Sequence, residues 1–105
     1  MPIHKFIYGA GGHAKEVLDA LLCHGAKVRV FDDGRSKEGS MILGVHVEHA
    51  ETGKLPPIAH VAVGDNLIRA QLYRSIKDEV ESWLSVIHPR SSVSESASVE
   101  DGVFI

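Results

Sequence analysis

The sequence predicts an α/β fold: a small Rossmann-like parallel sheet flanked by helices and followed by the first coil of a β-helix. Two observations predict the sheet. At residues 3–25 and again at 58–76, a short apolar run ends in a glycine turn and leads into an amphipathic helix. A third observation predicts the coil, because aliphatic residues recur every six positions towards the end of the chain. We therefore expect a Rossmann-like domain at residues 1–86 and a truncated hexapeptide β-helix at residues 87–105.

The first third of the chain is expected to form a strand, a helix and a second strand. Residues 3–8 are an apolar run that stops at a glycine cluster, as a buried parallel strand does. One helical stripe then combines Ala14, Val17, Leu18 and Leu21. Gly25 is placed to end that helix in a left-handed conformation, and residues 27–31 alternate between polar and apolar. The unit is β-α-β, with parallel strands.

The turn after the first strand has the composition of a phosphate-binding turn. Gly9, Gly11 and Gly12 stand in GAGGHA, which fits the dinucleotide pattern G-x-G-x-x-G/A. Glycines let the backbone approach a ligand, and the helix that begins here presents unpaired N–H groups to an anion. A diphosphate is the expected occupant. His13 either donates a ring N–H to a phosphate oxygen or only packs over the turn.

Two carboxylates, Asp32 and Asp33, follow the glycines at roughly the 20-residue distance of the dinucleotide pattern. Either one is expected to accept hydrogen bonds from ribose hydroxyls or from a base edge, and one could instead cap the following turn. Arg35 and Lys37 lie close enough in the chain to reach a phosphate, although charged loop residues are commonly just solvated.

The second half repeats the strand, turn and helix. Residues 34–57 are expected to be irregular, with one short hairpin about Gly44. A strand at 58–63 leads to Gly64, whose tight turn we place beside the first glycine turn. In the helix that follows, Asp65 is the expected N-cap, Arg69 is a possible ligand contact, and one stripe combines Ile68, Leu72 and Ile76. A last strand at 82–87 completes four parallel strands.

Beyond Pro89 the pattern has a period of six. The aliphatic residues in register are Ile87, Val93, Val99 and Ile105, and small or apolar residues follow four positions after the first three: Ser91, Ala97 and Val103. One coil cannot bury its own apolar face, so either the chain starts a longer protein or this segment is poorly ordered. The alternative is a Ser-rich flexible tail with chance spacing.

Composition limits the function classes. The 105 residues suffice for one small domain, and the net charge of −3 without a dense Lys/Arg run argues against nucleic acid or an anionic membrane as a partner. The single cysteine, Cys23, forms no internal disulfide, and no leader or long apolar segment is present, so we expect a cytoplasmic protein. His46 and His49 form an H-x-x-H pair without further ligands at suitable spacing, so we expect no metal site.

Four motifs in order resemble one family: IYGAGGHAKEV at the start, DD at 32–33, VGDN-x-x-R at 63–69, and IHP-x-SSV leading into the hexapeptides. The chain is similar to the N-terminal domain of bacterial hexapeptide-repeat sugar acetyltransferases. These are the sialic-acid O-acetyltransferase type and the UDP-4-amino-sugar N-acetyltransferases of bacillosamine and perosamine pathways. The likeness covers essentially the whole chain.

The resemblance implies a nucleotide-sugar-binding domain, most simply for a UDP-sugar, followed by a left-handed β-helix that binds acetyl-CoA and assembles as a homotrimer. It matches the diphosphate turn to Gly11, Gly12 and His13, the uridine-side acids to Asp32 and Asp33, and the second loop to Gly64 and Asn66. It also implies a role in cell-surface polysaccharide biosynthesis. The family's catalytic histidine lies in the β-helix, so no catalytic residue is expected in these 105 residues.

One departure from the family pattern concerns the loop after the aspartates. A basic residue often follows them directly, whereas here Gly34 intervenes before Arg35. Which sugar is held, and whether Arg35 makes the phosphate contact, therefore stay open. The same glycine turn and acid also suit a different class, a nicotinamide-dinucleotide-binding regulatory or redox module. A third possibility is an interaction module whose nucleotide cleft is vestigial.

Overall fold

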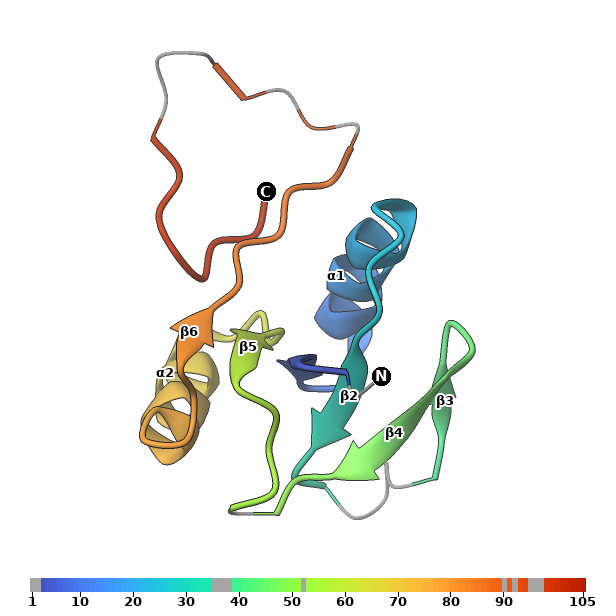
Figure 1. Ribbon diagram of the computed structural model, residues 1–105, viewed down its shortest axis with the longest axis vertical. Coiled ribbons are helices and arrows are strands. Elements are labelled where there is room, and N and C mark those ends of the chain that lie inside the picture. Colours follow the sequence, from blue (N-terminus) through green and yellow to red (C-terminus); the bar gives the residue numbers. More distant parts are fainter. Residues whose placement is uncertain (1–2, 35–38, 52, 90, 92, 95–97) are drawn as a thin grey trace.

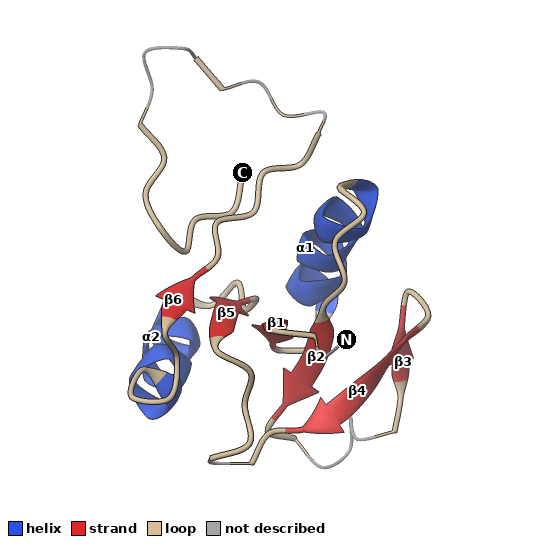
Figure 2. Cartoon of the chain, in the orientation of Figure 1, coloured by secondary structure: helices blue, strands red, loops and turns tan. Residues whose placement is uncertain are grey.

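The computed structural model describes residues 3–34, 39–51, 53–89, 91, 93–94 and 98–105. Within these residues, six strands form one sheet in the order β3-β4-β2-β1-β5-β6 (Figures 1 and 2). Five strands run parallel: β1 (Lys5–Tyr8), β2 (Arg29–Asp32), β4 (Val45–His49), β5 (Ile58–Val61) and β6 (Ser82–Trp83). The edge strand β3 (Met41–Ile42) runs antiparallel to β4. The Rossmann-like α/β fold predicted from the sequence is confirmed.

Helix α1 (Gly12–Cys23) covers one face of this sheet. Its predicted stripe, Ala14, Val17, Leu18 and Leu21, is buried and shares a hydrophobic cluster with Ile7 of β1 and Val30 of β2. The helix ends as expected, because Gly25 follows the C-cap with a φ of +72°. The first strand, helix and strand therefore form as the local pattern indicates.

Helix α2 (Asn66–Ile76) packs on the other face of the sheet from α1. On that face, Phe6, Tyr8 and Phe31 form a second hydrophobic cluster with Ile76. The predicted apolar stripe of this helix is wrong at its first position, since Ile68 is 48% exposed and Ile76 is the buried residue of α2. The helix lies at the end of the sheet beside β6, which pairs over only two residues, so little sheet is available to cover its first turns (Figure 1).

The structure corrects two further expectations about strands. The last strand was expected to span residues 82–87, but β6 ends at Trp83. The parallel sheet was expected to have four strands, whereas β4 adds a fifth by pairing with β2, with Val47 opposite Val30. The hairpin about Gly44 is confirmed, because β3 and β4 pair across Leu43 and Gly44, both with positive φ.

The end of the described C-terminal segment packs back against the residues that follow β6. Val86 and Phe104 form a parallel bridge, which places residues three six-residue repeats apart side by side (Figure 1). The backbone N–H of Ile105 donates to the Val86 carbonyl at 2.8 Å, and that of His88 donates to the Ile105 carbonyl at 2.8 Å. Val93, Val99 and Ile105 are each 37% exposed. This partial exposure is what one unstacked coil would leave. Ala97 of the predicted repeat lies outside the described residues.

Neither helix in the described part of the chain has the length and apolar character needed to cross a lipid bilayer.

Candidate functional site

A short glycine turn connects β1 to α1. Gly9 has a φ of +120°, and a Cβ atom there would lie 2.9 Å from the Ala62 carbonyl oxygen. Both the conformation and the contact exclude a side chain at this position. By contrast, a Cβ at Gly11 or Gly12 would meet no atom within 4 Å. These two glycines leave open space at the beginning of α1, where a ligand can approach the backbone closely.

The beginning of α1 is suited to an anion. Its N-cap is Gly11, and no side chain of the described residues forms a capping hydrogen bond there. The first turn contains no acidic residue. The first N–H groups of a helix lack intrahelical partners and carry a partial positive charge. A phosphate oxygen placed at this turn would satisfy those donors.

Asp32, at the carboxyl end of β2, orders the glycine turn through hydrogen bonds to the backbone. Its Oδ2 accepts a hydrogen bond from the Ala10 N–H at 2.9 Å, and its Oδ1 accepts one from the Gly34 N–H at 2.7 Å. Asp32 therefore joins the first turn and caps the loop after β2 at the same time. Each carboxylate oxygen retains a further lone pair, so these bonds do not prevent an additional hydroxyl from donating to it.

Asp33 has a different environment from its neighbour. Its side chain is exposed beyond the end of β2. Burial raises the pKa of the neighbouring Tyr8 hydroxyl, and the negative charges of Asp33, Asp32 and Glu79 raise it further. Tyr8 is therefore a neutral hydroxyl at physiological pH, and Asp33 is the carboxylate of the pair that faces solvent.

The two predicted loops lie side by side. A Cβ atom at Gly64 would lie 3.8 Å from the Cβ of His13, so the turn before α2 contacts the first turn of α1. The half-buried His13 ring also packs perpendicular to the Phe104 ring, at a centroid distance of 5.4 Å. His13 thus packs between the second loop and the C-terminal segment. The placement of Gly64 beside the first glycine turn follows the parallel arrangement of β1 and β5.

The second loop is built around Asp65 and Arg69. Asp65 is the N-cap of α2, as predicted, and accepts hydrogen bonds from the backbone of Leu67 and Ile68. The Arg69 guanidinium donates to the Asn66 side-chain oxygen and, at 3.4 Å, to the Val63 carbonyl. Arg69 therefore holds the Asn66 side chain in place.

In the described part of the chain, hollows open beside these residues, and two of them border the predicted contacts on different sides. One, of about 470 Å³, lies between the glycine turn and the β3–β4 hairpin and is lined by Ala10, Gly11, Gly12, Lys15, Ser40, Met41, Ile42 and Val47. The other, of about 420 Å³, lies between α2 and the C-terminal segment and is lined by Val61, Asn66, Arg69, Ala70, Tyr73, Trp83, Asp101 and Gly102. The predicted residues gather at one edge of the sheet, but Gly11 and Gly12 border a different hollow from Asn66. Arg35 lies outside the described residues.

Several residues at this edge were not predicted from the sequence. Lys15 borders the hollow at the glycine turn, and its position just after the glycine motif was the only signal for it. His60 is 2% exposed, and its Nδ1–H donates to the Leu84 carbonyl at 2.8 Å. Burial lowers the pKa of His60, and the charges of His13 and Arg69 act in the same direction. His60 is therefore neutral beneath the two loops. In the sequence, His60 stands only within the apolar run at 58–63, so no signal pointed to a role at this edge.

Comparison with known proteins shows which family and which solved structures the chain resembles. The family model described as the PglD N-terminal domain matches residues 6–76. A variant of perosamine N-acetyltransferase from Caulobacter crescentus, solved with CoA and GDP-perosamine, is 31% identical, with a TM-score of 0.82 over 96% of this chain. The acetyltransferase domain of PglB from Neisseria gonorrhoeae, solved with acetyl coenzyme A, is 28% identical, with a TM-score of 0.77 over 98% of this chain.

The chain spans only part of these proteins. It covers 50% of the Caulobacter crescentus chain and 53% of the Neisseria gonorrhoeae chain. An uncharacterized protein of Acanthamoeba polyphaga mimivirus is 29% identical over 98% of this chain, which corresponds to 21% of the viral protein. The resemblance seen in the sequence motifs is confirmed by the family model and by both solved structures.

Proposed function

The chain belongs to the PglD N-terminal domain family, and from this premise we propose that it is the nucleotide-sugar-binding domain of an acetyl-CoA-dependent sugar acetyltransferase. The observation that carries the proposal is the glycine turn. Gly11 and Gly12 leave an open approach to an α1 N-terminus without a side-chain cap, and Asp32 fixes that turn through the Ala10 N–H. The similar Caulobacter crescentus enzyme was solved with a nucleotide sugar, GDP-perosamine.

We assign the diphosphate to the beginning of α1. The N–H groups of Gly12 and His13 and the ring of His13 would contact its oxygens, since helix N-termini bind phosphates in this way. The hollow of about 470 Å³ beside Gly11 and Gly12 has room for part of the ligand. Lys15 borders the same hollow and adds positive charge there.

The remaining predicted contacts divide between the two ends of the ligand. Asp33, which is exposed, is the candidate that accepts a hydrogen bond from a ribose hydroxyl or a base edge. Asp32 stabilises the loop after β2 through the Gly34 N–H. Arg35 stays a proposed phosphate contact because it closely follows the two aspartates in the chain. Gly64 and Asn66 are the candidates on the sugar side, because the second loop lies against His13.

The acetyl transfer itself is assigned to a β-helix that continues from this chain. The parallel bridge between Val86 and Phe104 supports a coil of three six-residue faces. In the complete enzyme, an amine or hydroxyl of the bound sugar would attack the carbonyl carbon of acetyl-CoA. The bond from the sugar nitrogen or oxygen to the acyl carbon forms, a histidine of the β-helix takes the proton of that amine or hydroxyl, the C–S bond breaks, and coenzyme A leaves as the thiolate. A homotrimer and acetyl-CoA as co-substrate belong to this same proposal.

Calorimetric titration of the purified chain tests the proposal. UDP-, GDP- and CMP-sugars would be titrated separately, with NADH as the competing ligand class and circular dichroism to confirm that the protein is folded. We expect saturable binding of at least one nucleotide sugar and no binding of NADH. Saturable NADH binding alone would assign the glycine turn to a nicotinamide cofactor. A folded protein that binds neither class would have a vestigial cleft and would overturn the proposal.

A further inference from the structure

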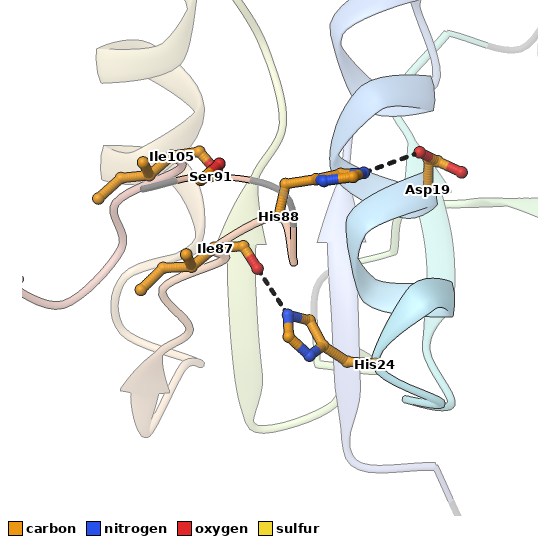
Figure 3. Close-up of polar contacts among 6 residues, drawn as sticks. All are labelled: Asp19, His24, Ile87, His88, Ser91 and Ile105. Carbon is orange, nitrogen blue, oxygen red and sulfur yellow. Dashed lines mark hydrogen bonds and ion pairs between the residues drawn. The ribbon is translucent and has the colours of Figure 1, made fainter. Parts of the chain in front are cut away.

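Three side chains with metal-binding groups meet at the far end of α1 from the glycine turn. They are Asp19 and Cys23 of α1 and His88 of the C-terminal segment, and their ligand atoms all lie within 4.8 Å of one another. The His88 Nε2 lies 3.3 Å from Asp19 Oδ2 (Figure 3). Asp19 and Cys23 are exposed, so an ion from solvent can reach the group.

The backbone brings the three side chains close to one another. Asp19 and Cys23 are four residues apart on a helix, so they lie one above the other on the same face. His88 is held at both of its backbone groups, because its N–H donates to the Ile105 carbonyl at 2.8 Å and its carbonyl accepts from the Ser91 N–H at 2.9 Å. The segment is also tied to α1 directly, since the His24 ring donates to the Ile87 carbonyl at 2.6 Å (Figure 3).

We propose that Asp19, Cys23 and His88 form a Zn²⁺ site that joins α1 to the C-terminal segment. A thiolate, an imidazole nitrogen and a carboxylate oxygen are the three ligand types that zinc takes in proteins. Bonds of about 2.0–2.3 Å in a tetrahedral arrangement separate ligand atoms by about 3.3–3.8 Å. The Asp19–His88 distance of 3.3 Å already fits, and the two separations from the Cys23 Sγ, which are at most 4.8 Å, would shorten by rotation of the exposed Cys23 side chain on binding. Water would complete the fourth position.

Binding requires the thiol of Cys23 to lose its proton to solvent, while His88 binds as the neutral imidazole and Asp19 as the carboxylate. The bound ion would cross-link residues that are far apart in the sequence, so it would bind the folded chain more tightly than the unfolded one. The site is independent of the proposed nucleotide site, which lies at the opposite end of α1. Spacing along the sequence does not indicate this site, because His88 lies more than 60 positions from Asp19 and Cys23.

Cobalt titration of tag-free, reduced protein tests the site. Co²⁺ bound to a thiolate gives a near-ultraviolet charge-transfer band that histidine and carboxylate sites lack. We expect one equivalent to produce this band in the wild type, and Zn²⁺ to abolish it by displacement. Cys23→Ser should remove the band, and Cys23→Ser and His88→Gln should each weaken Zn²⁺ binding by at least about 100-fold in calorimetry. His46→Gln, which removes an exposed histidine of β4, is the matched control and should bind like the wild type.

Thermal unfolding gives a second readout. Zn²⁺ should raise the midpoint temperature of the wild type and of His46→Gln, and leave that of Cys23→Ser unchanged. Because Cys23 is exposed, its replacement by serine is not expected to disturb folding. A titration without the charge-transfer band at saturation, or equal zinc affinity for Cys23→Ser and the wild type, would overturn the site.

Discussion

The carboxylate of Asp32 and the backbone N–H of Ala10 are joined by a 2.9 Å hydrogen bond that links the end of β2 to the glycine turn after β1. The other oxygen of the same carboxylate accepts from the Gly34 N–H. One side chain therefore sets the geometry of both loops that border the proposed ligand. Asp32 acts on binding through the backbone that it orders, whereas Asp33 remains exposed to solvent.

Replacing Asp32 by Asn is predicted to destabilise the domain by about 1–3 kcal/mol, because an amide offers one acceptor oxygen where two N–H groups donate. Urea unfolding measures this loss. Asp33→Asn is the matched control, since the same chemical change at an exposed side chain should alter stability by no more than about 0.5 kcal/mol. Equal losses in the two variants would show that the Asp32 bonds do not order the turn.

Substitutions of two glycines of the turn are predicted to have different effects: one should lower the free energy of unfolding, and the other should lower the affinity for the nucleotide sugar. Gly9→Ala should cost about 1–3 kcal/mol or more, because it combines a φ of +120° with a 2.9 Å approach to the Ala62 carbonyl oxygen. Gly12→Ala should leave stability unchanged or slightly raised, since Gly12 is helical and its Cβ would meet no atom. Its methyl group would instead occupy the approach of the phosphate and reduce nucleotide-sugar affinity at least tenfold, or by about 1.4 kcal/mol. Undiminished affinity in Gly12→Ala would remove the diphosphate from this position.

Stability is predicted to fall as the pH is lowered through the range where His60 titrates in the unfolded chain. Burial lowers the pKa of His60 in the folded protein, so the unfolded state binds the proton more readily. The contribution of neutral His60 is complete above about pH 6.5 and is lost below it, with a slope of at most about 1.4 kcal/mol per pH unit. Urea unfolding at intervals from pH 8 to pH 5 measures this slope.

His60→Asn is the test variant for this pH dependence, because an amide N–H can replace the Nδ1 donor to the Leu84 carbonyl without titrating. Its stability should depend less on pH than that of the wild type. His46→Gln removes an exposed histidine and should retain the full slope. If His60→Asn keeps the wild-type slope, another group is responsible for it.

The local features of this fold could be predicted from the sequence because each depends on neighbouring residues. The stripe of α1, the left-handed Gly25 and the Asp65 cap are set by spacing of a few positions. The parallel pairing of β4 with β2 could not be predicted, since a two-residue hairpin turn does not determine which strand its second arm joins. The exposure of Ile68 likewise depends on how little sheet lies beneath α2.

In the candidate site, too, features set by nearby residues could be predicted, whereas features set by contacts between distant residues could not. The glycine turn and the acids were identified by type and distance, and the adjacency of Gly64 and His13 followed from the parallel order of β1 and β5. The bond from the Gly34 N–H to Asp32 is the turn cap that was expected for one of the two aspartates. The bond from the Ala10 N–H was not predictable, because that N–H approaches Asp32 only when the glycine turn is formed. The packing of Phe104 against His13 depends on the return of the C-terminal segment.

Amide mapping by ¹⁵N–¹H NMR during titration with GDP- and UDP-sugars locates the bound nucleotide sugar on the domain. We predict that the largest shifts occur at the N–H groups of Gly11, Gly12 and His13, with smaller shifts at Gly64, and that inorganic diphosphate reproduces the shifts at the turn. Saturable binding whose shifts leave these amides unchanged would contradict the account, because the ligand would then lie elsewhere on the domain.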